Sequence, residues 1–263
     1  MKFLAKWRGR KNAAADPDSV YVSERYGVRS LHIGSDTIQS SMRLARPNDL
    51  ELSYTRSMMG FLLFVPQPRH ALMIGLGGGS LAKFIYHRLP GVHTRAIEVN
   101  ARVATVARQS FYVPPDDPRL EVLIEDGAAY VEREDVHADV ILVDGYEADH
   151  HVEALASEPF YSACRARLNP GGVMVVNLWG SDKLFYTLLG RIEQAFPAGT
   201  LCLPAERPGN VIVFGFQRAP GDLPWKALHE RAQRLEQAYG LEFPRFVESL
   251  RRMNRHTNAH LCP

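Results

Sequence analysis

The sequence predicts an α/β protein in which a mostly parallel β-sheet is covered by helices on both faces and follows a small N-terminal β-hairpin domain. Five apolar, strand-like runs lie between residues 70 and 179, and helix-like segments separate them. Continuous apolar runs that alternate with helices indicate parallel strands buried on both faces. A glycine cluster stands directly after the first run, at the strand end where open parallel sheets bind their ligands.

The composition is that of an ordinary globular protein, with 46% hydrophobic and 23% charged residues. The 31 Lys and Arg residues nearly balance the 29 Asp and Glu residues, so charge gives no reason to expect nucleic acid or an anionic membrane as a partner. No apolar run approaches the ~20 residues that cross a bilayer. The three cysteines form no CxxC pair. We therefore expect a cytoplasmic protein without a membrane partner.

The N-terminal part divides into three expected segments. Residues 1–18 are expected to form a loosely ordered tail, and residues 19–64 a β-hairpin with a connecting helix. The segment 20–42 is rich in β-branched and aromatic residues and contains two turn signals, which predicts a hairpin or a three-stranded meander. The segment 49–64 changes to helical character and ends before two prolines.

Residues 65–220 are predicted to form one sheet domain with seven strands. Two further strand-like runs, "TLCLPA" and "NVIVFGFQ", are joined by the loop "ERPG", which is too short for a crossover helix, so these runs should pair antiparallel. Residues 221–263 are charged and helix-like, which predicts a C-terminal helical extension. The five parallel strands are expected at 70–76, 93–99, 120–126, 139–145 and 172–179.

The glycine cluster forms a GxGxG turn from Gly75, Gly77 and Gly79, with Ser80 placed to cap the next helix. Glycines at such a turn let a ligand approach the backbone closely. A tight turn without a ligand would also explain this motif alone.

Acidic residues at the next two strand ends favour a ligand. Glu98 ends the second strand about 20 residues after the glycine loop, where a carboxylate can accept hydrogen bonds from ribose hydroxyls, and Asn100 is placed to cap the next helix. Asp126-Gly127 ends the third strand at the same edge, within reach of an adenine amino group. These residues predict a nucleoside site. The antiparallel strand pair resembles the adenosylmethionine-dependent methyltransferase fold, which favours an S-adenosyl ligand.

A group of acidic residues follows the fourth predicted strand. In a cleft, such carboxylates attract cations and can align one amine of a polyamine for reaction. An exposed acidic loop would have the same composition. The adjacent His150 and His151 point apart in an extended chain, so we expect no metal site. The stretch 144–153 contains no Lys or Arg, and its acids are Asp144, Glu147, Asp149 and Glu153.

These features resemble those of the polyamine aminopropyltransferases, the spermidine synthases, from about Val22 to Gln217. That family has an "IQ" near the end of an N-terminal hairpin, a "YHE" or "YQE" stretch on the following helix and a GGGDG nucleotide loop. The corresponding positions here are Ile38-Gln39, Tyr54, Gly77-Gly78-Gly79-Ser80-Leu81, Glu98, Asp126-Gly127 and Asp144.

The resemblance implies a divergent member of that family, with a Rossmann-like, seven-stranded, methyltransferase-type sheet. Its activity would be aminopropyl transfer from decarboxylated S-adenosylmethionine, a co-substrate rather than a tightly bound cofactor, to a polyamine such as putrescine. Spermidine and methylthioadenosine would be the products, Asp144 would accept the proton of the attacking amine, and the chain would form a homodimer or homotetramer. The implied nucleoside site comprises Gln39, Gly75, Gly77, Gly79, Glu98, Asp126 and Gly127, and the implied substrate site comprises Tyr54, Ser80, Asp144, Tyr146 and Glu147.

Three positions depart from the family pattern. Ser80 replaces the acid that would hold the amine of the donor, Thr55 replaces the His or Gln after the tyrosine, and Glu147 replaces a second Asp. Two other functions therefore stay open. One is methyl transfer from ordinary S-adenosylmethionine on the same fold, and the other is nucleoside binding without catalysis.

Overall fold

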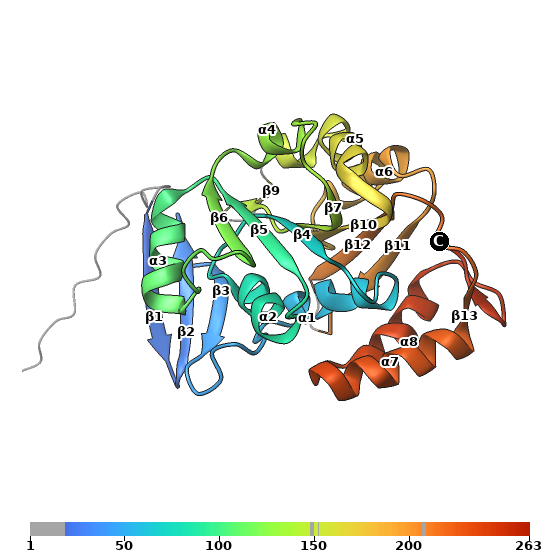
Figure 1. Ribbon diagram of the computed structural model, residues 1–263, viewed down its shortest axis with the longest axis horizontal. Coiled ribbons are helices and arrows are strands. Elements are labelled where there is room, and N and C mark those ends of the chain that lie inside the picture. Colours follow the sequence, from blue (N-terminus) through green and yellow to red (C-terminus); the bar gives the residue numbers. More distant parts are fainter. Residues whose placement is uncertain (1–18, 148–149, 152, 207–208) are drawn as a thin grey trace, which may run out of the picture.

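A seven-stranded sheet forms the centre of the protein, in the strand order β11-β12-β10-β7-β4-β5-β6 (Figure 1). The computed structural model describes residues 19–147, 150–151, 153–206 and 209–263, without the side chains of 146–147 and 150–151. The strands from β10 to β6 pair in parallel, and β12 pairs antiparallel with both β10 and β11, so the predicted fold class is confirmed. The strands are β4 (His70–Ile74), β5 (His93–Glu98), β6 (Leu120–Ile124), β7 (Ala138–Val143), β10 (Leu168–Trp179), β11 (Thr200–Pro204) and β12 (Asn210–Phe216).

Helices cover both faces of this sheet, which explains why its central strands β4, β7 and β10 are largely apolar. Alternate side chains of β4 enter opposite cores: Ala71 and Met73 pack on one face, Leu72 and Ile74 on the other. The first face is covered by α1 (Ser53–Met58), the 3₁₀ helix η1 (Met59–Leu63), α2 (Ser80–Arg88), α3 (Ala101–Phe111), α7 (Trp225–Tyr239) and α8 (Phe243–Met253). The second face is covered by α4 (Gly127–Val131), α5 (Glu158–Arg167) and α6 (Phe185–Ala195) (Figure 1).

The N-terminal sheet is a three-stranded antiparallel meander of β1 (Val20–Arg25), β2 (Val28–Ile33) and β3 (Ile38–Arg43). Tyr26 and Gly27 connect β1 to β2 with φ angles of 52° and 73°, the left-handed pair that a tight hairpin turn requires. Leu31 and Met42 of this sheet pack in one cluster with Val103 and Phe111 of α3. This contact fixes the meander beside the glycine loop.

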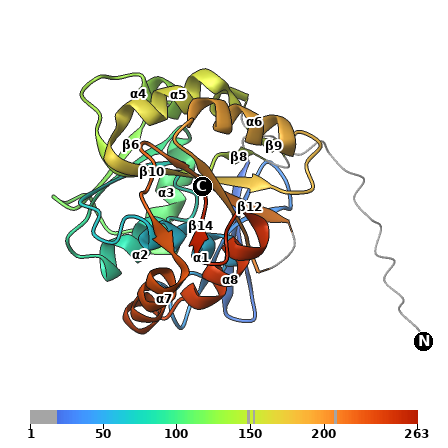
Figure 2. The same cartoon turned by 90° about the vertical axis from the view of Figure 1, so that its right-hand side faces the viewer.

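Several elements differ from the predictions. The helix expected over 49–64 is divided into α1 and η1, and the C-terminal extension contains a short strand pair, β13 (Leu223–Pro224) and β14 (His260–Leu261), besides its two helices. Figure 2 shows α7 and α8 on the same side of the sheet as α1. A second short pair, β8 (Tyr146–Glu147) and β9 (His150–His151), was not predicted. Across the described residues, no helix is long and apolar enough to span a membrane.

Candidate active site

A cavity of about 690 Å³ lies at the carboxyl ends of the parallel strands. Strands β5 and β7 flank β4 on opposite sides, so the cavity lies at the point where the strand order reverses, the usual ligand position in such sheets. The N-terminal meander and α1 close one side of it. Its lining includes Ile33, Thr37, Ile38, Gln39, Leu52, Tyr54, Ile74, Gly75, Gly77, Glu98, Asn100, Asp126, Gly127, Asp144, Asn177, Trp179 and Asn210.

The glycine loop brings the backbone of β4 against the backbone after β7. Gly75 has a φ of +92°, and a Cβ atom added there would lie 2.4 Å from the carbonyl oxygen of Asp144, so this position requires glycine. Gly77 also has positive φ and lines the cavity. The close approach at Gly75 is therefore one between two backbone segments of the chain itself, and close approach of a ligand to this loop stays a prediction.

The prediction that Ser80 caps helix α2 was wrong. The residue before α2 is Gly79, whose φ of 70° is left-handed and which makes no side-chain cap. Ser80 is buried in the first turn, and its Oγ lies 3.3 Å from Oγ of Ser40. A Cβ atom added to Gly79 would lie 2.2 Å from a methyl group of Val113. Neither Gly79 nor Ser80 belongs to the lining of the cavity, so the substitution at Ser80 lies behind the cavity wall.

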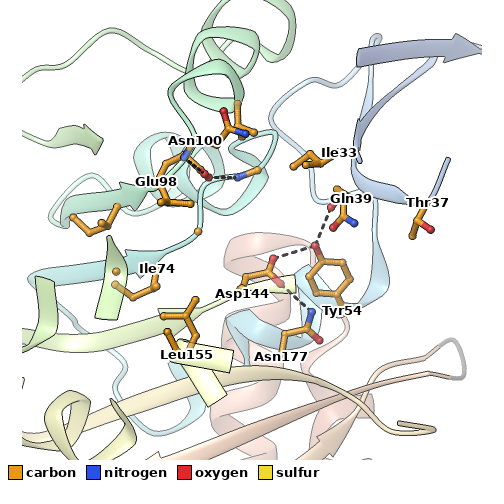
Figure 3. A pocket seen from close by; sticks show the side chains of 18 of the residues that line it. Ile33, Thr37, Gln39, Tyr54, Ile74, Glu98, Asn100, Asp144, Leu155 and Asn177 are labelled. Carbon is orange, nitrogen blue, oxygen red and sulfur yellow. Dashed lines mark hydrogen bonds between the residues drawn. The ribbon is translucent and has the colours of Figure 1, made fainter. Parts of the chain in front are cut away.

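Glu98 holds the glycine loop while it faces the cavity (Figure 3). Its side chain is buried, its Oε2 accepts hydrogen bonds from the backbone N–H groups of Leu76 (3.0 Å) and Gly77 (3.4 Å), and its Oε1 accepts one from Asn100 (2.9 Å). A carboxylate offers about four lone-pair sites. Sequence reasoning assigned Glu98 only to the ribose, whereas three backbone groups already bond to it.

Two further residues occupy helix starts at this end of the cavity. The side chain of Asn100 caps α3 by accepting a hydrogen bond from Arg102 N (2.9 Å), which confirms that prediction. The exposed Asp126 caps α4 in the same way through Ala129 N (2.8 Å). Gly127 follows it, and a Cβ atom there would lie 2.4 Å from Cγ2 of Ile74.

Asp144 follows β7 and lies at the centre of a hydrogen-bonded group (Figure 3). Its Oδ2 accepts a hydrogen bond from the Tyr54 hydroxyl (3.1 Å) and its Oδ1 accepts one from Nδ2 of Asn177 (2.9 Å). Nδ2 of Asn210 in turn donates to Oδ1 of Asn177 (2.9 Å). Burial raises the pKa of the Asp144 carboxyl, and the hydrogen bonds from Asn177 and Tyr54 oppose that rise.

Tyr54 remains a hydrogen-bond donor in this arrangement. Burial raises its pKa well above the ordinary value, and the negative charge of Asp144 and the hydrogen bond between them raise the pKa further. Its neighbour Thr55, which replaces the His or Gln of the family pattern, is buried, and its hydroxyl donates to the carbonyl oxygen of Leu52 (2.7 Å). The side chain of Thr55 is therefore bonded at the start of α1.

Sequence reasoning missed Asn177 and Asn210. Asn177 interrupts the apolar run "GVMVVNLW", and a buried amide in a core strand needs hydrogen-bond partners. That interruption was the available signal. Tyr146 and Glu147, which the sequence assigned to the substrate, form β8, and their side chains lie outside the described part of the structure, as does Asp149. Glu153 is exposed and is not among the lining residues.

The sheet order defines a protein of the methyltransferase-type fold, and the glycine loop and strand-end carboxylates line a cavity at the edge where such sheets bind their ligands. The particular family follows from comparison: the family model of the spermine/spermidine synthase domain matches residues 51–214, and the chain belongs to this family.

A relative of similar length agrees with that assignment, and two solved structures share the fold. A polyamine aminopropyltransferase of Chromobacterium violaceum is 44% identical over 254 residues, which cover 97% of each chain. The crystal structure of human methyltransferase-like protein 13 in complex with SAH is 26% identical, with a TM-score of 0.65 over 72% of this chain and 93% of that one. A probable spermidine synthase from Corynebacterium glutamicum shares the fold at 18% identity, with a TM-score of 0.69 over 91% of this chain and 93% of that one.

Proposed function

We propose that this chain transfers an aminopropyl group from decarboxylated S-adenosylmethionine to a polyamine acceptor such as putrescine, giving spermidine and methylthioadenosine. The proposal rests on the carboxylate of Asp144, which Tyr54 and Asn177 hold at both oxygens in a cavity whose opposite end is lined by the glycine loop, Glu98 and Asp126. The names of relatives that cover nearly the whole chain support the same activity.

The nucleoside end of the cavity suits the adenosyl part of the donor. The backbone of Gly75 and Gly77 allows close approach, the remaining lone-pair site of Glu98 can accept from a ribose hydroxyl, and Asp126 lies at the strand end where an adenine amino group would be reached. Gln39 lines the same cavity from the N-terminal meander. We assign these residues to donor binding.

The charge of the cavity favours a decarboxylated donor over ordinary S-adenosylmethionine. Among the described lining residues, the charged ones are Glu98, Asp126 and Asp144, all acidic. The carboxylate of ordinary S-adenosylmethionine would meet these like charges without an Arg or Lys from the described lining, whereas the amine and sulfonium of the decarboxylated form are attracted to them. This contrast favours aminopropyl transfer over the methyl transfer that the fold also supports.

Asp144 is assigned to the attacking amine. An alkylammonium has a pKa near 10 and must lose its proton before its nitrogen can attack. As the nitrogen bonds to the methylene carbon beside the sulfonium, the carbon–sulfur bond breaks, its electron pair returns to sulfur, and methylthioadenosine leaves. Asp144 accepts the proton and orients the amine, and its raised pKa makes it a better base than an exposed aspartate. Holding the two reactants in line supplies much of the remaining rate.

The wider setting of the enzyme is part of the same proposal. We place it in the cytoplasm, which the free thiols of Cys164, Cys202 and Cys262 support. A homodimer or homotetramer stays a prediction, as does the acidic group around Glu147 as an attraction for the acceptor.

Replacement of the proposed base tests the assignment. We expect Asp144→Asn to lower kcat by about 10²- to 10⁴-fold, because a positioned base is lost, while calorimetric affinity for methylthioadenosine is kept. Asp135→Asn, at an exposed carboxylate paired with Arg133, serves as the control and should leave kcat unchanged. Near-normal kcat in the Asp144 variant would overturn the role of this residue.

A further inference from the structure

We propose that the indole of Trp179 binds the distal ammonium of the acceptor and thereby selects amines with a second positive charge. The inference rests on the proposed aminopropyl transfer, because it places the reacting nitrogen of the acceptor at Asp144. Trp179 lines the same cavity and is the last residue of β10.

The strand register places the indole on the same side of the sheet as the amide that bonds to Asp144. Asn177 and Trp179 are two residues apart on β10, so their side chains share one face. Asn210 of β12 stands directly opposite Trp179 in the antiparallel pair, and its amide reaches across to Asn177. Asn177, Trp179 and Asn210 therefore form one continuous wall that starts at Asp144.

A glycine holds the indole in place. Gly209 has a φ of +132°, and a Cβ atom added to it would lie 2.6 to 3.0 Å from three ring carbons of Trp179. Only glycine lets the ring lie against this backbone. The N–H of Gly180 donates to the carbonyl oxygen of Gly209 (2.5 Å), which joins the residues that follow Trp179 to the residue that supports its ring. Despite this contact Trp179 is 44% exposed, and it belongs to the lining of the cavity.

The distances suit a short diamine. Val176 pairs with Val143 in the parallel register, so Asn177 lies level with Asp144, and Trp179 lies about 7 Å farther along the strand, outward from the sheet. The two nitrogens of an extended diaminobutane are about 6 Å apart, from five bonds of about 1.5 Å in a zigzag. With one nitrogen at Asp144, the other reaches the indole.

The chemistry of the wall suits a cation at that position. Glu98 and Asp126 belong to the opposite, nucleoside end of the cavity, because β5 and β6 lie on the other side of β4 from β10. The amide of Asn177 already bonds to Asp144 and Asn210. The face of an indole attracts an ammonium group through its quadrupole, more strongly than a phenyl ring and without a fixed hydrogen-bond geometry.

The test compares an acceptor with and without the distal charge. Putrescine and n-butylamine have the same carbon chain, but only putrescine carries a second ammonium. We expect Trp179→Leu to weaken putrescine binding and raise its KM by about 5- to 30-fold, while Trp179→Phe costs less than about threefold. Binding of n-butylamine and kcat for putrescine should change little in both variants. Tyr186→Phe and Tyr186→Leu, at an exposed aromatic outside the cavity lining, are the matched controls.

Putrescine affinity is also measured by calorimetry on protein saturated with methylthioadenosine. This measurement does not depend on turnover. If Trp179→Leu loses affinity for putrescine but keeps its affinity for n-butylamine, the inference is supported. This holds even if the wild-type protein fails to transfer an aminopropyl group, a result that would reject the proposed function. Unchanged putrescine affinity in Trp179→Leu, or equal losses for both amines, overturns the inference while leaving the proposed function intact.

Discussion

The hydroxyl of Tyr54 is expected to contribute to catalysis through Asp144, and Tyr54→Phe removes that hydroxyl alone. The hydroxyl donates to Oδ2 of Asp144 at 3.1 Å, and its ring packs against the core. This hydrogen bond orients the carboxylate toward the attacking amine, and a hydrogen bond to a charged group is worth about 1.5–3 kcal/mol. Loss of that orientation should outweigh the gain in basicity of Asp144, so kcat/KM should fall by about 10- to 150-fold. Affinity for methylthioadenosine should stay at the wild-type value, because Glu98 and the glycine loop are unchanged.

The pH profile gives a second readout of the same variant. Asp144 must be ionised to accept a proton, so activity is lost as pH falls through its pKa. Burial raises that pKa and the Tyr54 hydrogen bond opposes the rise, so Tyr54→Phe raises the pKa further. The acidic limb of kcat/KM should therefore move to higher pH.

A second tyrosine provides the control for this experiment. The hydroxyl of Tyr86 donates to Oδ2 of Asp117 at 2.6 Å, away from the cavity, so Tyr86→Phe removes a comparable bond without touching the site. Its kinetics should match those of the wild type. If Tyr54→Phe keeps kcat/KM within about threefold of wild type and its pH profile is not displaced, the hydrogen bond does not have the strength assumed here.

Three further variants test other parts of the account. Glu98→Gln should weaken calorimetric binding of methylthioadenosine by about 10- to 100-fold, because a charged acceptor is lost; unchanged affinity in a folded variant would remove Glu98 from the nucleoside site. Gly75→Ala should lower the free energy of unfolding by about 2–4 kcal/mol, because the added Cβ atom would lie 2.4 Å from the carbonyl oxygen of Asp144. Gly91→Ala is the control: an added Cβ atom meets open space there, so the same denaturant titration should show no change. Burial lowers the pKa of Lys83 from 10.5 to about 8. Between about pH 8 and 10.5 the unfolded chain therefore holds a proton on Lys83 that the folded chain has lost, so the free energy of unfolding should rise with pH over this range. Relative to Lys83→Met, the rise should reach up to about 3 kcal/mol. Parallel stability curves for wild type and Lys83→Met would refute that interpretation.

The fold could be predicted because a buried parallel strand has a simple signature. Each central strand needs apolar residues on both faces, so β4, β7 and β10 are visible as nearly continuous runs, and the short loop before β12 excludes a crossover helix. The strand ends were less accurate. The predicted run 70–76 includes Gly75 and Leu76, but β4 ends at Ile74, because the backbone turns at the left-handed Gly75.

The sequence predicted those site residues that stand at the ends of strands. Glu98 and Asp144 stand at strand ends that parallel pairing brings to one edge, so their place in the cavity followed from the pattern. The contact between Asn177 and Asn210 depends on the pairing of two strands, which no local pattern specifies. The start of α2 was misjudged because Gly79, not Ser80, stands at the N-cap; its left-handed conformation and its closeness to Val113 both favour glycine there.

The mass of the amine product distinguishes aminopropyl transfer from methyl transfer. Wild-type protein is incubated with putrescine and either decarboxylated or ordinary S-adenosylmethionine, and both the amine and the nucleoside are identified by mass spectrometry, with Asp144→Asn as the parallel sample. We expect the decarboxylated donor to yield spermidine and methylthioadenosine in equal amounts and the ordinary donor to yield neither a methylated amine nor adenosylhomocysteine. The variant should yield far less product in the same time. Methylated putrescine with adenosylhomocysteine, or no product from either donor, would contradict aminopropyl transfer.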